Sequence, residues 1–169
     1  MGGQELPDNP LQADRLLRVL HTHEVDFIVI GGMAGLAHGS SYPTYDLDIA
    51  YSRDQRNLER MAAALAELDV TLRGASSDLP LQLDAQTLAN GANFTFDSSY
   101  GSFDILGHAD GMGSYEALRS DADVATIEGI EVRVASLDHL ISMKRAANRP
   151  KDRLMVEEYL SLDDQQGES

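Results

Sequence analysis

The stretch that most limits how this chain can fold is FIVIGGMAGLAHGSSYPTYDLDIAY, residues 27–51. It begins with an apolar, β-branched run at 27–30, which is typical of a buried strand. Gly31 and Gly32 follow at once, and glycine permits unusual backbone angles and close approach of a ligand to the main chain. Residues 33–37 then favour a helical turn whose free N–H groups attract anions such as phosphate. The stretch predicts a strand, a glycine turn and a short helix.

A second strand is predicted at residues 45–51, where polar and apolar residues alternate. Leu47 and Ile49 point to one face, and Asp46 and Asp48 point to the other. Residues two apart on a strand lie about 7 Å from each other, so the two carboxylates repel unless a cation lies between them. Magnesium is the natural cation because it prefers oxygen ligands. A solvated strand face shows the same pattern, so the pair alone leaves both interpretations open.

Further motifs complete a pattern that is known from one protein family. A third aspartate, Asp104, lies in GSFDILG at 101–107, on a strand predicted to return from a hairpin turn at 98–101. The ordered set of glycine turn, D-x-D strand and third carboxylate resembles the DNA polymerase beta-like nucleotidyltransferase superfamily, in particular its minimal bacterial members. Residues 136–160 resemble the C-terminal helices of those members, and the resemblance runs from about residue 12 to residue 160.

The resemblance implies a fold and an activity. The fold would be α/β: a small mixed β-sheet with helices packed mainly on one side, plus C-terminal helices. The activity would be Mg²⁺- or Mn²⁺-dependent transfer of a nucleoside monophosphate from a nucleoside triphosphate to a hydroxyl acceptor. Asp46 and Asp48 would bind both metal ions, and Asp104 would bind the ion that activates the acceptor and would act as general base. If Asp104 is not the third carboxylate, Asp97 or Asp110 has to be considered.

The predicted nucleotide-binding residues are Gly31, Gly32, Thr44 and Lys144. The glycines also suit a tight strand-to-helix connection without a ligand, and Thr44 either fixes its loop or touches a phosphate. Lys144 belongs to a basic group that also contains Arg145, Arg149, Lys151 and Arg153. This group is either a triphosphate clamp, with Lys144 the best candidate by resemblance, or a solvated helix end. Asp152 is expected to pair with one of the basic side chains, and His38 is expected to be structural.

One departure from the family pattern affects the functional prediction. Many relatives carry an arginine two positions before the threonine of the D-x-D strand, and Tyr42 stands there in this chain. The alternative function is therefore a nucleotidyltransferase-like antitoxin or nucleotide-binding interaction module with little or no catalysis. Candidate acceptors for an enzyme are a small molecule such as an antibiotic, a partner protein or a tRNA end. The chain has little length for an acceptor domain, which leaves room for a partner or a second copy to complete the site.

Composition narrows the classes of partner and compartment. The 169 residues carry a net charge of −15, which argues against long nucleic acids because these bind basic surfaces. There is no cysteine, so disulfides, cysteine-ligated zinc and thiol catalysis are excluded. The N-terminus lacks the features of a secretory signal, and no apolar run reaches membrane-spanning length. We expect a cytoplasmic protein with a flexible tail at 1–9, one domain at 10–160 and an acidic tail at 161–169.

The remaining elements are predicted from capping residues and periodicity. Asp8 or Asn9 is expected to cap a first helix that starts at Pro10 and runs to about His23. Ser52 with Gln55 resembles a capping box that opens a helix to about residue 68. Residues 74–91 are ambiguous, and alternating leucines at 79, 81 and 83 suggest a strand without excluding a loop or helix. Strands are also expected at 70–72, 94–97, 103–106, 124–127 and 130–134, and helices at 114–119, 137–147 and 150–160.

Overall fold

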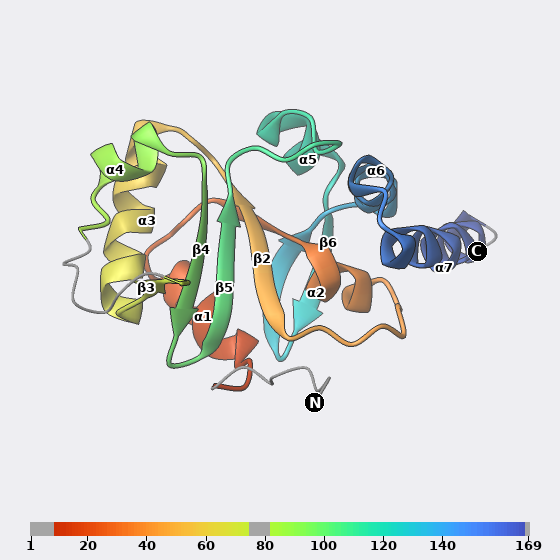
Figure 1. Ribbon diagram of the computed structural model, residues 1–169, viewed down its shortest axis with the longest axis horizontal. Coiled ribbons are helices and arrows are strands. Elements are labelled where there is room, and N and C mark those ends of the chain that lie inside the picture. Colours follow the sequence, from red (N-terminus) through yellow and green to blue (C-terminus); the bar gives the residue numbers. More distant parts are fainter. Residues whose placement is uncertain (1–8, 75–81, 168–169) are drawn as a thin grey trace.

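The protein is built around a mixed β-sheet, seen here in a computed structural model that describes residues 9–74 and 82–167 (Figure 1). The described strands are β1 (Phe27–Ile30), β2 (Asp46–Tyr51), β3 (Thr71–Leu72), β4 (Asn93–Ser98), β5 (Gly101–Leu106), β6 (Asp123–Ile127) and β7 (Ile130–Val134). They form one seven-stranded sheet in the order β3-β4-β5-β2-β1-β7-β6. The strands that carry the three predicted site aspartates, β2 and β5, are therefore neighbours near the middle of the sheet.

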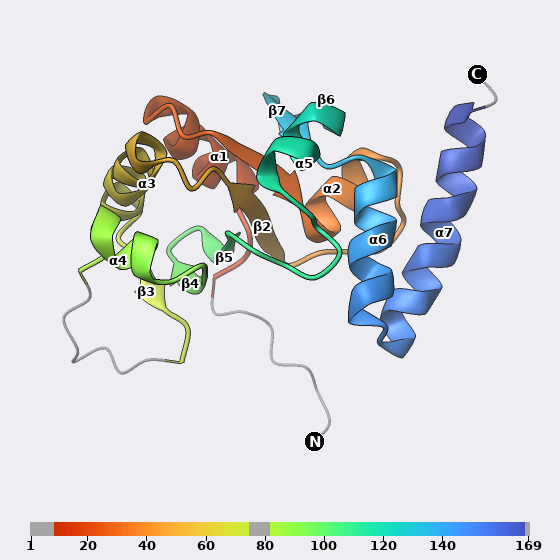
Figure 2. The same cartoon turned by 90° about the horizontal axis from the view of Figure 1, so that it is seen from above.

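Helices flank this sheet at both ends and on its faces. The described helices are α1 (Ala13–Thr22), α2 (Gly31–Ala37), α3 (Gln55–Leu68), α4 (Ala85–Asn90), α5 (Tyr115–Asp121), α6 (Leu137–Ala147) and α7 (Pro150–Gly167). Helices α3 and α4 lie at the β3 end, and α6 and α7 lie side by side at the other end (Figure 2). The mixed α/β architecture confirms the predicted fold class. No helix in the described ranges is long and apolar enough to cross a membrane.

The alternation in β2 determines which face of the sheet is buried. Leu47 and Ile49 are fully buried, and their neighbours across the parallel β2–β5 pairing, Phe103 and Ile105, are fully buried as well. Burying an aliphatic or aromatic side chain of this size contributes about 1.5–3 kcal/mol. A shift of one residue in the register would turn these side chains to the opposite face. The apolar face therefore fixes the register that turns the aspartates of β2 and β5 to the other side.

Tight turns and helix caps reproduce most of the predicted boundaries. The β6–β7 hairpin turns at Glu128 and Gly129, whose φ angles of 48° and 84° are both positive, as a type I′ turn requires. The Ser136 side chain accepts a hydrogen bond from the His139 backbone N–H, and α6 spans the predicted 137–147. The strands predicted from residues 27, 45, 94, 124 and 130 are present within one residue of those starts, and the strand predicted from residue 103 begins two residues earlier, at Gly101.

The predicted start of the first helix is wrong. Helix α1 begins at Ala13, and neither Pro10 nor an Asn9 cap starts it. Asn9 Nδ2 donates instead to the Ser98 carbonyl at 3.1 Å, and the Gln12 N–H donates to the Tyr100 carbonyl at 2.8 Å. These contacts hold the segment against the β4–β5 hairpin, so the chain is not yet helical where local sequence favoured a cap. Asp8, most of the expected N-terminal tail, Leu79 and Leu81 lie outside the described residues.

Three other boundaries differ from prediction. Asp54, not Ser52, caps α3, because its side chain accepts from the Arg56 N–H at 3.0 Å. Asp84 caps the short helix α4 by accepting from Thr87 N–H, so Leu83 precedes a helix and does not continue a strand. Helix α7 continues past residue 160 to Gly167, which makes the first seven residues of the predicted acidic tail helical. Its polar residues are compatible with helix and contain no proline or glycine before Gly167.

Candidate active site

The glycine turn predicted between β1 and α2 brings the main chain against an acidic side chain. Gly31 has a φ of +66°, a conformation that glycine adopts without strain. A Cβ atom at this position would collide with Asp48 Oδ2. At Gly32, a Cβ atom would lie 2.6 Å from Thr44 Oγ1, which is too close for two non-bonded heavy atoms. Both glycines are therefore required by the approach of the D-x-D strand and of the loop before it.

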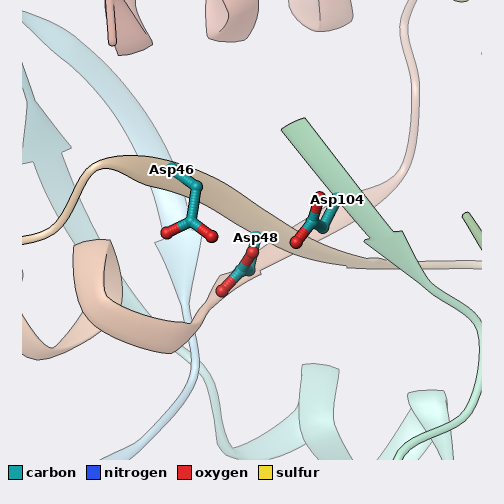
Figure 3. A group of neighbouring side chains, drawn as sticks. All are labelled: Asp46, Asp48 and Asp104. Carbon is teal, nitrogen blue, oxygen red and sulfur yellow. The ribbon is translucent and has the colours of Figure 1, made fainter. Parts of the chain in front are cut away.

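Three carboxylates meet on the polar face of β2 and β5 (Figure 3). Asp46 and Asp48 project from β2, and Asp104 projects from β5, where it lies directly opposite Asp48 in the parallel register. One oxygen from each of the three side chains lies within 4.8 Å of the others, and all three side chains are half-buried. In the described ranges, no other group of three acidic or histidine side chains comes together in this way. The structure thus assembles the three aspartates that the sequence singled out.

This assembly is electrostatically unfavourable without a counter-charge. Burial, followed by repulsion from Asp46 and Asp104, raises the pKa of Asp48 to about 8, and Lys144 opposes the rise. Burial also raises the pKa of Asp104, although the Arg73 guanidinium beside it acts in the opposite direction. Among the described atoms, Asp48 Oδ1 is buried and has no hydrogen-bond partner. A buried carboxylate oxygen without a donor is stabilised by a proton or a cation, and oxygen clusters of this kind fit Mg²⁺ or Mn²⁺.

A buried acid holds two basic side chains near the carboxylates. Asp152 on α7 is fully buried, and its two oxygens accept from Arg149 Nε at 2.6 Å and Arg149 Nη2 at 3.1 Å. Lys144 Nζ on α6 lies 3.3 Å from Asp152 Oδ1. These partners, Arg149 foremost, lower the pKa of Asp152 to about 2. The expected pairing of Asp152 is confirmed, and it ties α6 to α7.

Two of the three aspartates, Asp46 and Asp48, line one cleft of about 730 Å³ together with several basic side chains. Its lining residues are Gly31, Gly32, Tyr42, Pro43, Thr44, Tyr45, Asp46, Asp48, Arg73, Ser102, Lys144, Arg149, Lys151 and Met155. Arg145 and Arg153, the other members of the predicted basic group, do not line it. A second cavity of about 360 Å³ adjoins the cleft, since both are lined by Gly31, Asp48, Lys144 and Arg149. The rest of its lining is mostly apolar and comes from Ile30, Leu106, Ala109, Asp110, Leu140, Met143 and Ala147.

The loop that enters β2 is fixed from two sides. The Thr44 hydroxyl donates to the Asp46 carbonyl at 3.2 Å, which holds the end of the loop against the strand. Glu158 on α7 accepts from the hydroxyls of Ser40 and Ser41 and from the Ser41 N–H at 3.2 Å. His38 Nε2 lies 2.8 Å from the Ala135 carbonyl, which agrees with the structural role expected for it.

Two contributors to the site were missed in the sequence. Arg73 Nη2 donates to Asp104 Oδ1 at 2.8 Å, and Glu158 anchors the loop that carries Tyr42 and Thr44. Arg73 is 31 residues from Asp104, and Glu158 is 117 residues from Ser41. No local spacing connects such pairs, so no pattern in this single sequence points to them.

Comparison with known proteins identifies the fold. No model of a known protein family matches the chain, and no curated protein matches it. The lincosamide antibiotic adenylyltransferase LnuA, solved with lincomycin, superposes with a TM-score of 0.59 at 13% identity over 91% of this chain and 99% of its own. ANT(2'')-Ia in complex with adenylyl-2''-tobramycin superposes with a TM-score of 0.57 at 16% sequence identity, over 88% of this chain and 85% of its own. A proposed nucleotidyltransferase from Thermotoga maritima superposes with a TM-score of 0.50 at 16% sequence identity, over 96% of this chain and 98% of its own. The chain therefore has a nucleotidyltransferase-like fold, as predicted.

The close approach of Gly31 to Asp48 predicts a large effect of one methyl group. Gly31→Ala adds a collision with Asp48 to the strain of a positive φ, and we expect it to lower the free energy of unfolding by at least about 2 kcal/mol. Gly113→Ala is the matched control, because Gly113 has a φ of +72° with no atom within 4 Å of its added Cβ. Gly113→Ala should lower the free energy of unfolding by about 1 kcal/mol. If urea unfolding gave the two variants equal losses in free energy of unfolding, the collision of the added methyl group with Asp48 would contribute nothing, which would contradict the prediction.

The raised pKa of Asp48 predicts how stability changes with pH. Between the ordinary value of 3.8 and about 8, the folded state binds more protons than the unfolded state. The free energy of unfolding contributed by this group therefore falls as pH rises through that window. Asp48→Asn has no proton to lose, so in EDTA it should match the wild type near pH 4 and become progressively more stable than it towards about pH 8. Urea unfolding at a series of pH values measures the difference in free energy of unfolding between variant and wild type, and Asp110→Asn is the control. A difference that does not change with pH would contradict the raised pKa of Asp48.

Proposed function

We propose that this chain is a metal-dependent nucleotidyltransferase that moves a nucleoside monophosphate from a nucleoside triphosphate to a hydroxyl acceptor. The observation that carries the proposal is the meeting of Asp46, Asp48 and Asp104 beside a cleft lined by basic side chains. Asp48 Oδ1 has no donor among the described residues, which supports a cation as the missing partner. The nucleotidyltransferase-like fold supports the same reaction class.

Different residues around the cleft have different roles in the proposed reaction. Asp46, Asp48 and Asp104 would hold Mg²⁺ or Mn²⁺, which when bound supplies charge for the attacking and leaving oxygens. Lys144, held near the carboxylates by Asp152, would bind the triphosphate together with the Gly31–Gly32 turn. The adjoining apolar cavity beside Met143 would take the base. The two cavities share lining residues, so one nucleotide could span them.

The proposed step is a substitution at the α-phosphorus. The acceptor oxygen forms a bond to that phosphorus, the bond to the bridging oxygen breaks, and pyrophosphate leaves. Asp104 takes the proton of the acceptor hydroxyl, since a neutral hydroxyl is a weak nucleophile. Asp104 is the cluster member on β5, so the acceptor would approach from the side of Ser102, which lines the cleft two residues earlier on that strand.

Small hydroxylated molecules are the acceptors that we favour. LnuA is an antibiotic adenylyltransferase, and ANT(2'')-Ia was solved with an adenylylated tobramycin. A partner protein is the second choice, and the net charge of −15 disfavours a tRNA end. Tyr42, which lines the cleft where many relatives carry arginine, favours a second candidate: an antitoxin-like nucleotide-binding module without transfer.

Thermal unfolding tests the nucleotide site. At about 100 times its dissociation constant, a ligand that binds only the folded state stabilises it by about 2.7 kcal/mol. We expect at least one of the four nucleoside triphosphates to raise the melting temperature in the presence of Mg²⁺ or Mn²⁺ and none to do so in EDTA. Asp48→Asn should abolish the shift, and the control Asp138→Asn on the exposed start of α6 should keep it. Unchanged melting curves with all four triphosphates at millimolar concentration would reject the proposal.

A second variant separates binding from transfer. Asp104→Asn keeps the shape of the side chain but removes the base, so nucleotide binding should stay near normal while transfer falls at least about 10²-fold. Mass spectrometry of small-molecule acceptors, or of the protein itself if it modifies itself, measures the transfer. Transfer by Asp104→Asn at the wild-type rate would exclude Asp104 as the base. Nucleotide binding without transfer to any acceptor would favour the antitoxin-like module.

A further inference from the structure

Arg73 reaches the carboxylate cluster from the far side of a neighbouring strand. It lies in the turn after β3, and its N–H donates to the Thr95 carbonyl at 2.9 Å. Its guanidinium crosses β4, where Nη2 donates to the Phe96 carbonyl at 2.9 Å. The same Nη2 donates to Asp104 Oδ1 at 2.8 Å, and Nε lies 3.3 Å from Asp97 Oδ1. Backbone groups of β4 therefore hold Arg73 in place independently of Asp104.

Arg73 is the direct counter-charge of the cluster. In the described part of the chain, no other basic side chain forms an ion pair with Asp46, Asp48 or Asp104. Lys144, which also lines the cleft, pairs with Asp152 instead. A guanidinium remains charged at any working pH and gives directional hydrogen bonds, so it is a permanent cation at this position. The Asp104 side chain is only 15% exposed, which leaves water little access to screen the pair.

We propose that Arg73 is an internal counter-cation that holds Asp104 in the cluster and competes with metal ions for it. The proposal rests on the metal site of the proposed function. While no metal is bound, Arg73 offsets part of the repulsion among the three carboxylates. An arriving cation has to share Asp104 with the guanidinium, and the positive charge nearby weakens its binding. Arg73 is thus a positioning residue that sets the metal affinity of the Asp104 side of the site.

Competition between Arg73 and the metal predicts that metal affinity rises when the charge of Arg73 is removed. Two unit charges a few ångströms apart at a partly exposed site interact by enough to change an equilibrium severalfold. Arg73→Gln keeps hydrogen-bond donors but removes the charge, so it should tighten Mn²⁺ binding at least about fivefold. A residue that merely supported the fold would weaken metal binding when replaced. Arg73→Lys restores the charge and should return the affinity to within about twofold of the wild type.

Electron paramagnetic resonance of free Mn²⁺ measures these affinities, with and without a non-hydrolysable triphosphate. Arg18→Gln is the matched control, because it changes the net charge equally at an exposed position of α1. It should change Mn²⁺ affinity less than twofold. Equal or weaker binding by Arg73→Gln, with a normal control, would overturn the counter-cation proposal and leave the proposed function standing. Absence of Mn²⁺ binding in the wild type would overturn the metal site and this proposal together.

A measurement on the wild type covers the case in which Arg73→Gln does not fold. Side-chain nitrogen NMR resolves individual arginine Nε–H groups, and the Arg73 signal should move on Mg²⁺ titration as Asp104 is shared. The Arg18 signal should stay in place. An Arg73 signal that does not respond, while Mg²⁺ binding is shown by the Asp48 or Asp104 carboxyl signals, would contradict the competition.

Discussion

The arrangement of the site follows from one constraint: three mutually repelling aspartates are placed at one point of the sheet. Asp46, Asp48 and Asp104 bring oxygens within 4.8 Å of one another on a half-buried face. Their register is fixed by the opposite face of the same strands, where Leu47, Ile49, Phe103 and Ile105 are fully buried. The apolar core therefore determines that the acids meet. Burial of Asp48, followed by repulsion from Asp46 and Asp104, raises the pKa of Asp48 to about 8.

The surrounding elements can be understood as responses to this concentration of negative charge. Arg73 approaches Asp104 from the β4 side, and Lys144 and Arg149 are held on the other side by the buried Asp152. Gly31 carries no side chain, which allows Asp48 to come close to the main chain. A chain with a net charge of −15 thus concentrates several of its cations around one acidic cluster. Basic side chains around an acidic cluster complement a ligand that contains both a metal ion and phosphate groups.

The parts that the sequence predicted are those specified by short-range patterns. Alternation placed Asp46 and Asp48 on one face, and the hairpin between β4 and β5 placed Asp104 on the matching face. Ser136 marked the start of α6 correctly because a cap acts within three residues. The resemblance to nucleotidyltransferases joined these local patterns into one site, and the fold comparison confirms the architecture.

The parts that were missed depend on contacts between residues far apart in the chain. Helix α1 starts late because Gln12 is bound to Tyr100, and Asn9 is bound to Ser98. Arg73 had no local reason to be linked with Asp104, and Glu158 had none to be linked with Ser40 and Ser41. Helix α7 was predicted too short because a polar sequence suggested a tail, although nothing in it breaks a helix before Gly167. Tertiary contacts decided all of these features except the length of α7, and periodicity carries no information about such contacts.

The most direct measurement of the central claim is a crystal structure with Mn²⁺ and a non-hydrolysable nucleoside triphosphate, recorded where manganese scatters anomalously. The account predicts anomalous density bonded to oxygens of Asp46 and Asp48, with Asp104 at the same centre and the phosphates beside Lys144. Anomalous density at other acidic residues, or a triphosphate bound in the cleft with no metal at these aspartates, would contradict it.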